Sequence, residues 1–286
     1  MIGFSLGVAA ALCWAGLDVV RKALAQKASP SALAIFLLLG MVPFLGAWAA
    51  YDGAWITDGQ YWLPAVASMS MNALANVLFM RSVQVSPLSR TVPFLSLTPV
   101  FSALAAIPLL AEVPGALHWA GIVLVVLGAL VLNSDLGDSW WKSLLHEKGA
   151  PYMIAVAVLW AFSTALDKRA LAHSSPASHA FLLSVGSSAI LGTWILARRQ
   201  QSEVRAVFSA PKGLLTGLIA LAVAALALQM LALQWLWVAV LETLKRAFGV
   251  LGSVAFGRLF FHEAITGRKV AAACLMVAGT SLLAFA

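Results

Sequence analysis

The sequence contains two similar halves, and this repetition limits the possible folds more than any other feature. Residues 14–30 read WAGLDVVRKALAQKASP and residues 160–176 read WAFSTALDKRALAHSSP, so a tryptophan, a basic pair, Ala-Leu-Ala and Ser-Pro recur about 147 positions apart. The ends of the halves also match, since Glu112 recurs as Glu263. We therefore expect each half to form the same set of elements.

Most of the remaining sequence is apolar. The chain of 286 residues is 62% hydrophobic and 10% charged, with a mean hydropathy of +0.94, so lipid rather than water must be the main solvent. The stretches long enough to span a bilayer are residues 2–24, 31–50, 61–83, 88–111, 116–132, 150–172, 177–197, 212–233, 237–261 and 267–285. Five spans per half is an odd number, so the second half enters the bilayer upside down. The sequence predicts an all-α membrane protein with ten transmembrane helices in two inverted five-helix repeats.

The boundaries between the repeats follow from the longest polar stretch. We expect a first repeat at residues 1–132, an interfacial linker at residues 133–149 and a second, inverted repeat at residues 150–286. In the linker, four apolar residues at helical spacing predict a short helix on the membrane surface. These are Trp140, Trp141, Leu144 and Leu145.

Basic residues are distributed unevenly among the loops. Only Lys168 and Arg169 follow even-numbered spans. Thirteen follow odd-numbered spans: Arg21, Lys22, Lys27, Arg81, Arg90, Lys142, Lys148, Arg198, Arg199, Arg205, Lys212, Arg268 and Lys269. Because basic loops tend to stay in the cytoplasm, this distribution predicts that both termini lie outside it.

The ends of the two halves resemble the paired repeats of the drug/metabolite transporter superfamily, in its ten-helix, EamA-like branch. They read LTPVFSALAAIPLLAEVPGALHWAGIVLVVLGALVL and GVLGSVAFGRLFFHEAITGRKVAAACLMVAGTSLLAF. The resemblance includes Trp14, Pro99, Glu112 and Glu263. It implies an integral, multi-pass protein of the bacterial inner membrane, with a central cavity lined by the first, third, fourth, sixth, eighth and ninth helices. It also implies cytoplasmic termini, in conflict with the basic residues.

The ninth span contains the most distinctive charges, in the segment LETLKRAFG. Lys245 lies about 12 Å along this helix, where a cation should face protein or water rather than lipid. One interpretation is structural: Glu242, three and four residues earlier on the same face, neutralises Lys245 and Arg246. The other is functional: the two cations bind an anionic substrate, since guanidinium and ammonium groups both bind phosphate and carboxylate.

Leu244, Lys245 and Arg246 resemble the valine-lysine-arginine motif of plastid triose-phosphate/phosphate translocators. The resemblance implies that the basic pair binds phosphate. That family has a further lysine in its fourth helix, and the aligned residue here is Leu95. With two cations instead of three, a carboxylate or a singly bound phosphate fits better than a triose phosphate, unless Arg90 reaches in.

Other spans supply candidate lining residues. Trp14, Asp18 and Arg21 share a face of the first helix, and Trp160 lies on the matching face of the sixth. Asp18 is either a proton carrier or counter-ion at the site, or a structural partner of Arg21 or Lys22. The tryptophans either bound the substrate or only pack.

Two amides share a face in the middle of the third helix. Asn72 and Asn76 either contact substrate or hold helices together, and Gln229 lies at comparable depth in the partner helix. In the fourth span, three prolines predict a kinked helix that faces the cavity. They are Pro93, Pro99 and Pro108.

An enzyme is the competing class, and its motifs are absent from the sequence. There is no GxSxG or HExxH, and we interpret the histidines as residues of helix ends and loops. Cys13 and Cys274 lie in separate spans, and we expect both to be small buried hydrophobic residues rather than metal ligands. We expect no catalytic residue, metal or cofactor.

The sequence therefore predicts a secondary transporter of a small anionic or zwitterionic organic solute, working by alternating access. The candidate substrate-binding residues are Lys245, Arg246, Trp14, Asp18, Asn72, Asn76, Trp160 and Glu242. Alternatives are an exporter of amino acids or aromatic metabolites and a flippase for a phosphate-bearing lipid. The expected partners are a small-molecule substrate, the lipid bilayer and a coupling ion or counter-substrate, with no nucleic acid. The protein would be a monomer or a homodimer.

Overall fold

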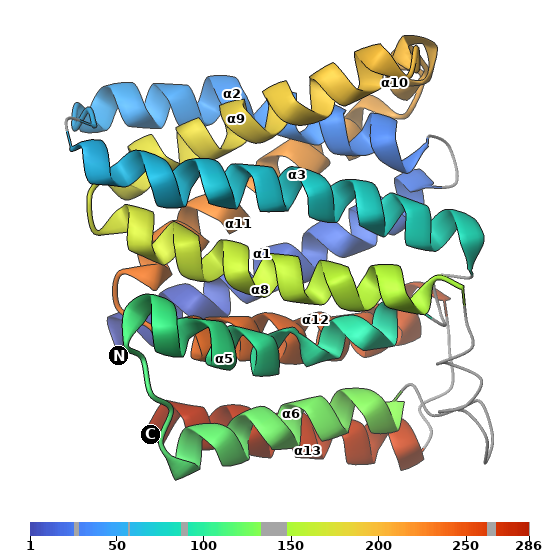
Figure 1. Cartoon of the computed structure of the whole chain (residues 1–286). Helices are drawn as coiled ribbons and strands as arrows, with labels where there is room; N and C mark the ends of the chain where they lie inside the picture. The colour runs from blue at the N-terminus through green and yellow to red at the C-terminus, as the bar shows by residue number, and fades with distance from the viewer. Residues whose placement is uncertain (26–28, 57, 87–90, 133–147, 262–266, 286) are drawn as a thin grey trace.

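The computed structural model of the chain is a bundle of long helices (Figure 1). It describes residues 1–25, 29–56, 58–86, 91–132, 148–261 and 267–285. Within these ranges there is no strand, and the elements are α1 (Ile2–Ala25), α2 (Pro30–Asp52), η1 (Gly59–Tyr61), α3 (Trp62–Val85), η2 (Val92–Leu97), α5 (Thr98–Leu110), α6 (Ala116–Leu132), α8 (Ala150–Leu171), α9 (Pro176–Ala197), α10 (Gln201–Val207), α11 (Lys212–Leu233), α12 (Val238–Phe261) and α13 (Gly267–Phe285). The prediction of an all-α membrane protein is confirmed.

The recurring Ser-Pro starts the second helix of each half in the same way. Ser29 has extended backbone angles, and its side chain accepts a hydrogen bond from the amide of Ala32. Ser175 does the same for the amide of Ser178 at the start of α9. In both halves proline follows the capping serine, at a position where the helix needs no N–H donor.

The fourth predicted span is not one continuous α-helix. The six residues of η2 form a 3₁₀-helix, and α5 begins only at Thr98. Pro99 lies in the first turn of α5, where its missing N–H costs no hydrogen bond. The predicted kink is present as this break. The predicted surface helix around Trp140 lies outside the described residues.

Helix pairings recur with the two halves exchanged. In the first half α1 packs most closely against α11 and α12, and in the second half its counterpart α8 packs against α3 and α5. Figure 1 shows α1 starting at the end that carries both termini and α8 starting at the opposite end. A pseudo-two-fold axis in the membrane plane relates such halves, so the inverted-repeat prediction is confirmed.

The helix pair α6 and α13 lies at one edge of the bundle (Figure 1). Its contact depends on glycine, because a Cβ atom added to Gly121 would lie 2.8 Å from the backbone oxygen of Gly279. A Cβ atom added to Gly279 would lie 2.7 Å from the oxygen of Gly121. Small residues of this kind allow helix backbones in a membrane to approach closely.

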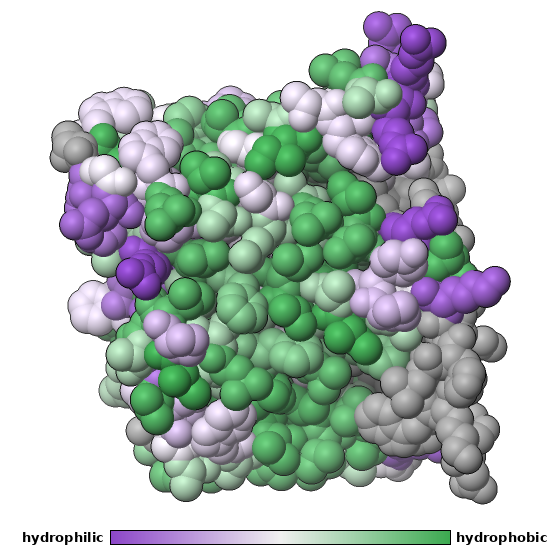
Figure 2. Space-filling model, in the orientation of Figure 1, coloured by the Kyte–Doolittle hydropathy of each residue, from purple (hydrophilic) through white to green (hydrophobic). Residues whose placement is uncertain are grey.

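The outer surface between the two ends of the bundle is apolar. Figure 2 shows a broad hydrophobic band with hydrophilic residues gathered at the ends of the helices. Exposed residues of this apolar kind include Leu39, Leu74 and Val277. The prediction that both cysteines are buried was wrong, because Cys274 is exposed and Cys13 is half-buried. A surface facing lipid has no need to exclude small hydrophobic residues.

Candidate functional site

Four helices meet at a polar cluster inside the bundle. Lys245 Nζ of α12 donates a hydrogen bond to Glu242 Oε1 at 2.7 Å and lies 5.4 Å from the ring centroid of Trp14 on α1. The Trp14 indole N–H donates to Gln229 Oε1 of α11 at 3.0 Å. Thr164 of α8 donates to the same Glu242 oxygen at 3.1 Å. We call these five residues the central cluster.

Within the central cluster the charges of Glu242 and Lys245 cancel. The Glu242 side chain is 1% exposed and that of Lys245 is 14% exposed, so both are largely removed from solvent. A close ion pair with an additional hydrogen bond from Thr164 offsets part of the desolvation penalty. The pair therefore brings no net charge to the interior.

Arg246 adds a positive charge that this pair does not neutralise. It follows Glu242 by four residues, so it lies one turn along the same face of α12. Its Nε atom is buried and has no hydrogen-bond partner among the residues that the structure describes. A buried N–H group of a cation without an acceptor is unfavourable, by several kcal/mol on transfer scales. The described part of the chain therefore holds no acceptor for this atom.

Two other predicted residues lie near the central cluster. Asp18 is exposed, and its carboxylate lies 3.5 Å from Arg21 Nη1. Arg21 in turn lies 5.9 Å from the ring centroid of Trp14. Trp160 is on α8, where its carbonyl oxygen lies 3.0 Å from Thr164 Oγ1 and its ring centroid lies 6.0 Å from that of Phe79. The structure does not bring the two tryptophans into contact with each other.

The two asparagines of α3 face α8. Asn72 Nδ2 donates to the hydroxyl of Ser163 and lies 3.4 Å from Ser68 Oγ. Asn76 Nδ2 donates to the backbone oxygen of Asn72 at 2.8 Å. Both amides are half-buried, and Asn72 belongs to a hydrogen-bonded network that joins α3 to α8.

This network continues to a buried carboxylate and imidazole that the sequence analysis missed. Asp167 Oδ1 accepts a hydrogen bond from Ser68 and lies 3.2 Å from His179 Nε2, while Tyr61 OH lies 3.1 Å from His179 Nδ1. We predicted that the histidines lie at helix ends and in loops. His179 does lie in the first turn of α9, at the start of that helix, but its side chain is fully buried, which the sequence did not indicate. In the sequence, Asp167 stands directly before the basic pair Lys168 and Arg169. Such a run of charges is typical of the solvated end of a helix, so the sequence did not single out Asp167 as a buried residue.

Glu112 connects α5, α8 and α12 near the end that carries the termini. One carboxylate oxygen accepts a hydrogen bond from Lys168 Nζ at 2.5 Å, and the other accepts from the amide of Val238 at 2.9 Å. Lys168 also donates to the carbonyl of Leu236. The equivalent Glu263, and the predicted contributor Arg90, lie outside the described residues.

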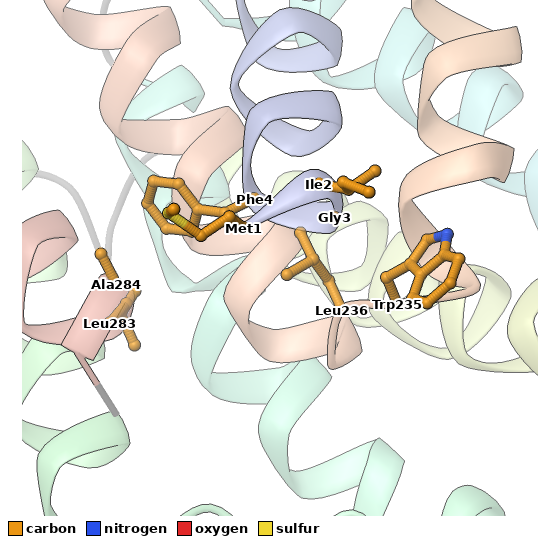
Figure 3. A pocket seen from close by; sticks show the side chains of 8 residues that line it. All are labelled: Met1, Ile2, Gly3, Phe4, Trp235, Leu236, Leu283 and Ala284. Carbon is orange, nitrogen blue, oxygen red and sulfur yellow. The ribbon is translucent and has the colours of Figure 1, made fainter.

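Two hollows in the surface lie away from the central cluster. One, of about 490 Å³, lies between the start of α1, the turn before α12 and the end of α13 (Figure 3). The other, of about 470 Å³, lies between α2, α3 and the end of α9 and is lined by Arg81, Arg198 and Gln200 among others. Neither is lined by Lys245 or Arg246.

Comparison with known proteins identifies the family. The model of the EamA-like transporter family matches residues 1–134 and residues 147–285. The chain belongs to the EamA-like transporter family. Its members in the drug/metabolite transporter superfamily move small molecules, so this EamA-like protein is a multi-pass integral membrane transporter. Membership of a transporter family favours a non-enzymatic transporter over an enzyme.

The fold is also found among solved structures. Of 29 matching chains, one described only as "Crystal structure of protein" has a TM-score of 0.77 and 16% sequence identity, covering 100% of this EamA-like chain and 98% of its own. At this identity the likeness establishes the fold alone. No curated protein matches the sequence.

Proposed function

We propose that this EamA-like protein is a secondary transporter of a small organic anion, and that Arg246 and Lys245 bind the carboxylate or phosphate of that anion. The observation that carries the proposal is the buried Arg246 Nε without an acceptor. Guanidinium groups bind carboxylates and phosphates through two parallel hydrogen bonds, which would satisfy this atom. Trp14, held by Gln229, supplies an apolar surface beside the charges for the rest of the solute.

Alternating access fits the inverted halves. Because α1, α11 and α12 pack as α8, α3 and α5 do, the two halves can exchange packing arrangements and open the bundle at either end. The central cluster is built from α1, α8, α11 and α12, so it includes helices of both halves. A rocking motion would therefore expose a bound anion first at one end and then at the other.

A thermal-stability screen with matched neutral compounds tests the proposal. Acetate, benzoate, inorganic phosphate and glycerol phosphate are compared with acetamide, benzamide and glycerol, using the purified protein. We expect at least one anion, and no neutral analogue, to raise the melting temperature, since a ligand that binds only the folded state stabilises it. Arg246→Gln should remove the shift. Arg205→Gln, which changes an exposed arginine on α10, should keep it.

One observation favours a second candidate, the export of amino acids or aromatic metabolites. Glu242 already neutralises Lys245, which leaves a less basic site beside Trp14. If phenylalanine and tryptophan stabilise the protein while every anion fails, and Arg246→Gln changes nothing, this second function replaces the first.

A further inference from the structure

A chain of hydrogen bonds leads from one end of the bundle to its interior. It starts at Tyr61 in η1 and passes through His179, Asp167 and Ser68. Ser68 lies 2.8 Å from Ser163 Oγ, and Ser163 accepts a hydrogen bond from Asn72. We call the carboxylate and imidazole of this chain the Asp167–His179 pair.

Within the described part of the chain, Asp167 has no lysine or arginine as an ion-pair partner. Its titratable partner is His179, at 3.2 Å, and the two side chains are 3% and 0% exposed. With a neutral imidazole the pair therefore carries one negative charge, and with a protonated imidazole it carries none. Ionisable groups inside a membrane protein are costly and commonly mark proton relays.

The hydrogen bonds show where the proton would be bound. In the neutral form, His179 Nε2–H donates to the Asp167 carboxylate and Nδ1 accepts from the Tyr61 hydroxyl; this tautomer follows from the network. Uptake of a proton from water forms an N–H bond at Nδ1. The new N–H then donates to the Tyr61 oxygen, and the Tyr61 hydroxyl hydrogen turns away.

Apart from Arg246, the other charged groups on the elements around the pair are matched by a partner or lie at the ends of the bundle. On α8, Lys168 is bound to Glu112, and on α12 Glu242 is bound to Lys245. At the surface of the same end, His173 Nδ1 lies 2.6 Å from Asp58 Oδ2. On α2 the one charged residue is the exposed Asp52. The helices α3 and α11 carry charge only at Arg81 and Lys212, both at the opposite end of the bundle (Figure 1). The proton on the Asp167–His179 pair thus sets a charge that these groups do not compensate.

The Asp167–His179 pair is connected to the proposed anion site through α8. Asp167 and Thr164 are three residues apart on α8, and Thr164 donates to Glu242 in the central cluster. Glu242, Lys245 and Arg246 together carry one positive charge, which the ionised Asp167 balances. A bound monoanion would leave one excess negative charge in the interior, and one proton on His179 would cancel it.

We propose that the Asp167–His179 pair binds the proton that is transported together with the anion, so that the protein is a proton–anion cotransporter. This inference rests on the proposed anion site, and it adds the coupling ion and the sign of coupling. Anion and proton favour one another's binding because each reduces the charge that the other leaves uncompensated. By thermodynamic reciprocity, a pH change that loads the pair must also tighten anion binding.

The first measurement needs no substrate. The protein in lipid nanodiscs, with ¹⁵N-labelled histidine, is titrated by NMR from about pH 8.5 to about pH 5, which spans the range where histidine charges change. The His179 signal is assigned by its loss in His179→Gln. We expect His179 to take up a proton, and Asp167→Asn to lower its proton affinity about tenfold or more, because the opposite charge is lost. A His179 that keeps one protonation state throughout would overturn the proposal.

The second measurement follows the melting-temperature shift caused by the anions of the screen at low and high pH. We expect a larger shift at low pH in the unaltered protein and no pH dependence in Asp167→Asn. Ser68→Ala removes a hydrogen bond to the same carboxylate but keeps both titratable groups, so it should retain the pH dependence, as should the surface change Asp58→Asn. If Ser68→Ala also loses the pH dependence of the shift, the hydrogen bonds of Asp167 have only a structural role, and the inference fails. If anions bind equally well at low and high pH, proton coupling is overturned but the anion site is not. If no anion binds at any pH, the anion site is overturned as well.

Discussion

At the level of single residues, ionisable groups inside the bundle differ in whether another side chain matches their charge. Glu242 matches Lys245 and Glu112 matches Lys168, each through direct contact. Arg246 has no such partner among the described residues, and Asp167 has only a titratable imidazole. The two incompletely matched groups are therefore the ones that an anion and a proton would complete.

Replacing Glu242 with glutamine keeps the side-chain shape and removes its charge. Lys245 would then be a buried cation without a counter-charge, and we expect the free energy of unfolding to fall by about 3 to 5 kcal/mol. The affinity for the anions of the screen should rise, since the site would carry two free cations. Thermal melts with an anion titration measure both effects. Asp18→Asn, at an exposed pair, should change stability by less than about 1 kcal/mol. Unchanged stability together with unchanged anion affinity in Glu242→Gln would contradict the ion pair's role.

Some of these residues could be predicted from the sequence, and others could not. Lys245 and Glu242 stand out because charges are rare in an apolar span, and their spacing places them on one face. The contacts with Trp14 and Thr164 join separate helices, which spacing within one helix cannot reveal. His179 was missed for the same reason, since its partners Asp167 and Tyr61 come from other elements.

At the level of elements, the start of α12 depends on a side chain from the end of α5. Glu112 accepts a hydrogen bond from the amide of Val238, which has no acceptor within its own helix. In Glu112→Ala this amide loses its partner and Lys168 loses its counter-charge, so unfolding should require about 1.5 to 3 kcal/mol less. Hydrogen exchange should quicken at Val238 and its neighbours. Glu203→Gln on α10 is the control, and exchange that rises equally in both variants would refute the cap.

The contact between α6 and α13 depends on missing side chains. Gly279→Ala would place a Cβ atom 2.7 Å from the Gly121 oxygen, so the helices must separate. We expect a loss of about 1 to 3 kcal/mol, typical of overpacking, in a thermal or denaturant melt. Gly217→Ala on α11, where a Cβ atom would meet nothing within 4 Å, should leave the melt unchanged. Equal melts for the two variants would show that the contact can relax.

Element boundaries were largely predictable because the bilayer sets the length of each apolar stretch. The predicted residues 212–233 are those of α11, and 116–132 are those of α6. The fourth span differs because its prolines divide it into η2 and α5. The short helix α10 was not predicted, since seven mixed residues give no hydropathy signal.

At the level of the whole molecule, the pseudo-symmetry of the fold does not extend to its chemistry. Trp14 on α1 donates to Gln229 on α11, whereas the corresponding Trp160 on α8 has its ring beside Phe79 of α3. The helix pairs α1–α11 and α8–α3 are equivalent in the fold, but the tryptophan makes a hydrogen bond in the first pair and an aromatic contact in the second. The repeated sequence therefore predicted the axis, while the asymmetry of the site depends on residues in which the halves differ.

The orientation in the membrane follows from the charges at the two ends. Arg81, Arg198 and Lys212 lie at the end opposite the termini, while at the other end Lys168 and Arg169 are held by Glu112 and the Leu109 carbonyl. Because basic residues hold loops in the cytoplasm, we expect the termini outside it, against the orientation that the family resemblance implies.

Single cysteines replacing Ala54 and Ser202, in a chain lacking Cys13 and Cys274, can be labelled with a membrane-impermeant maleimide. Both sites are exposed and lie at opposite ends. Labelling of intact cells at position 54, with position 202 reacting only after permeabilisation, is the expected result, and the reverse pattern would place the termini in the cytoplasm.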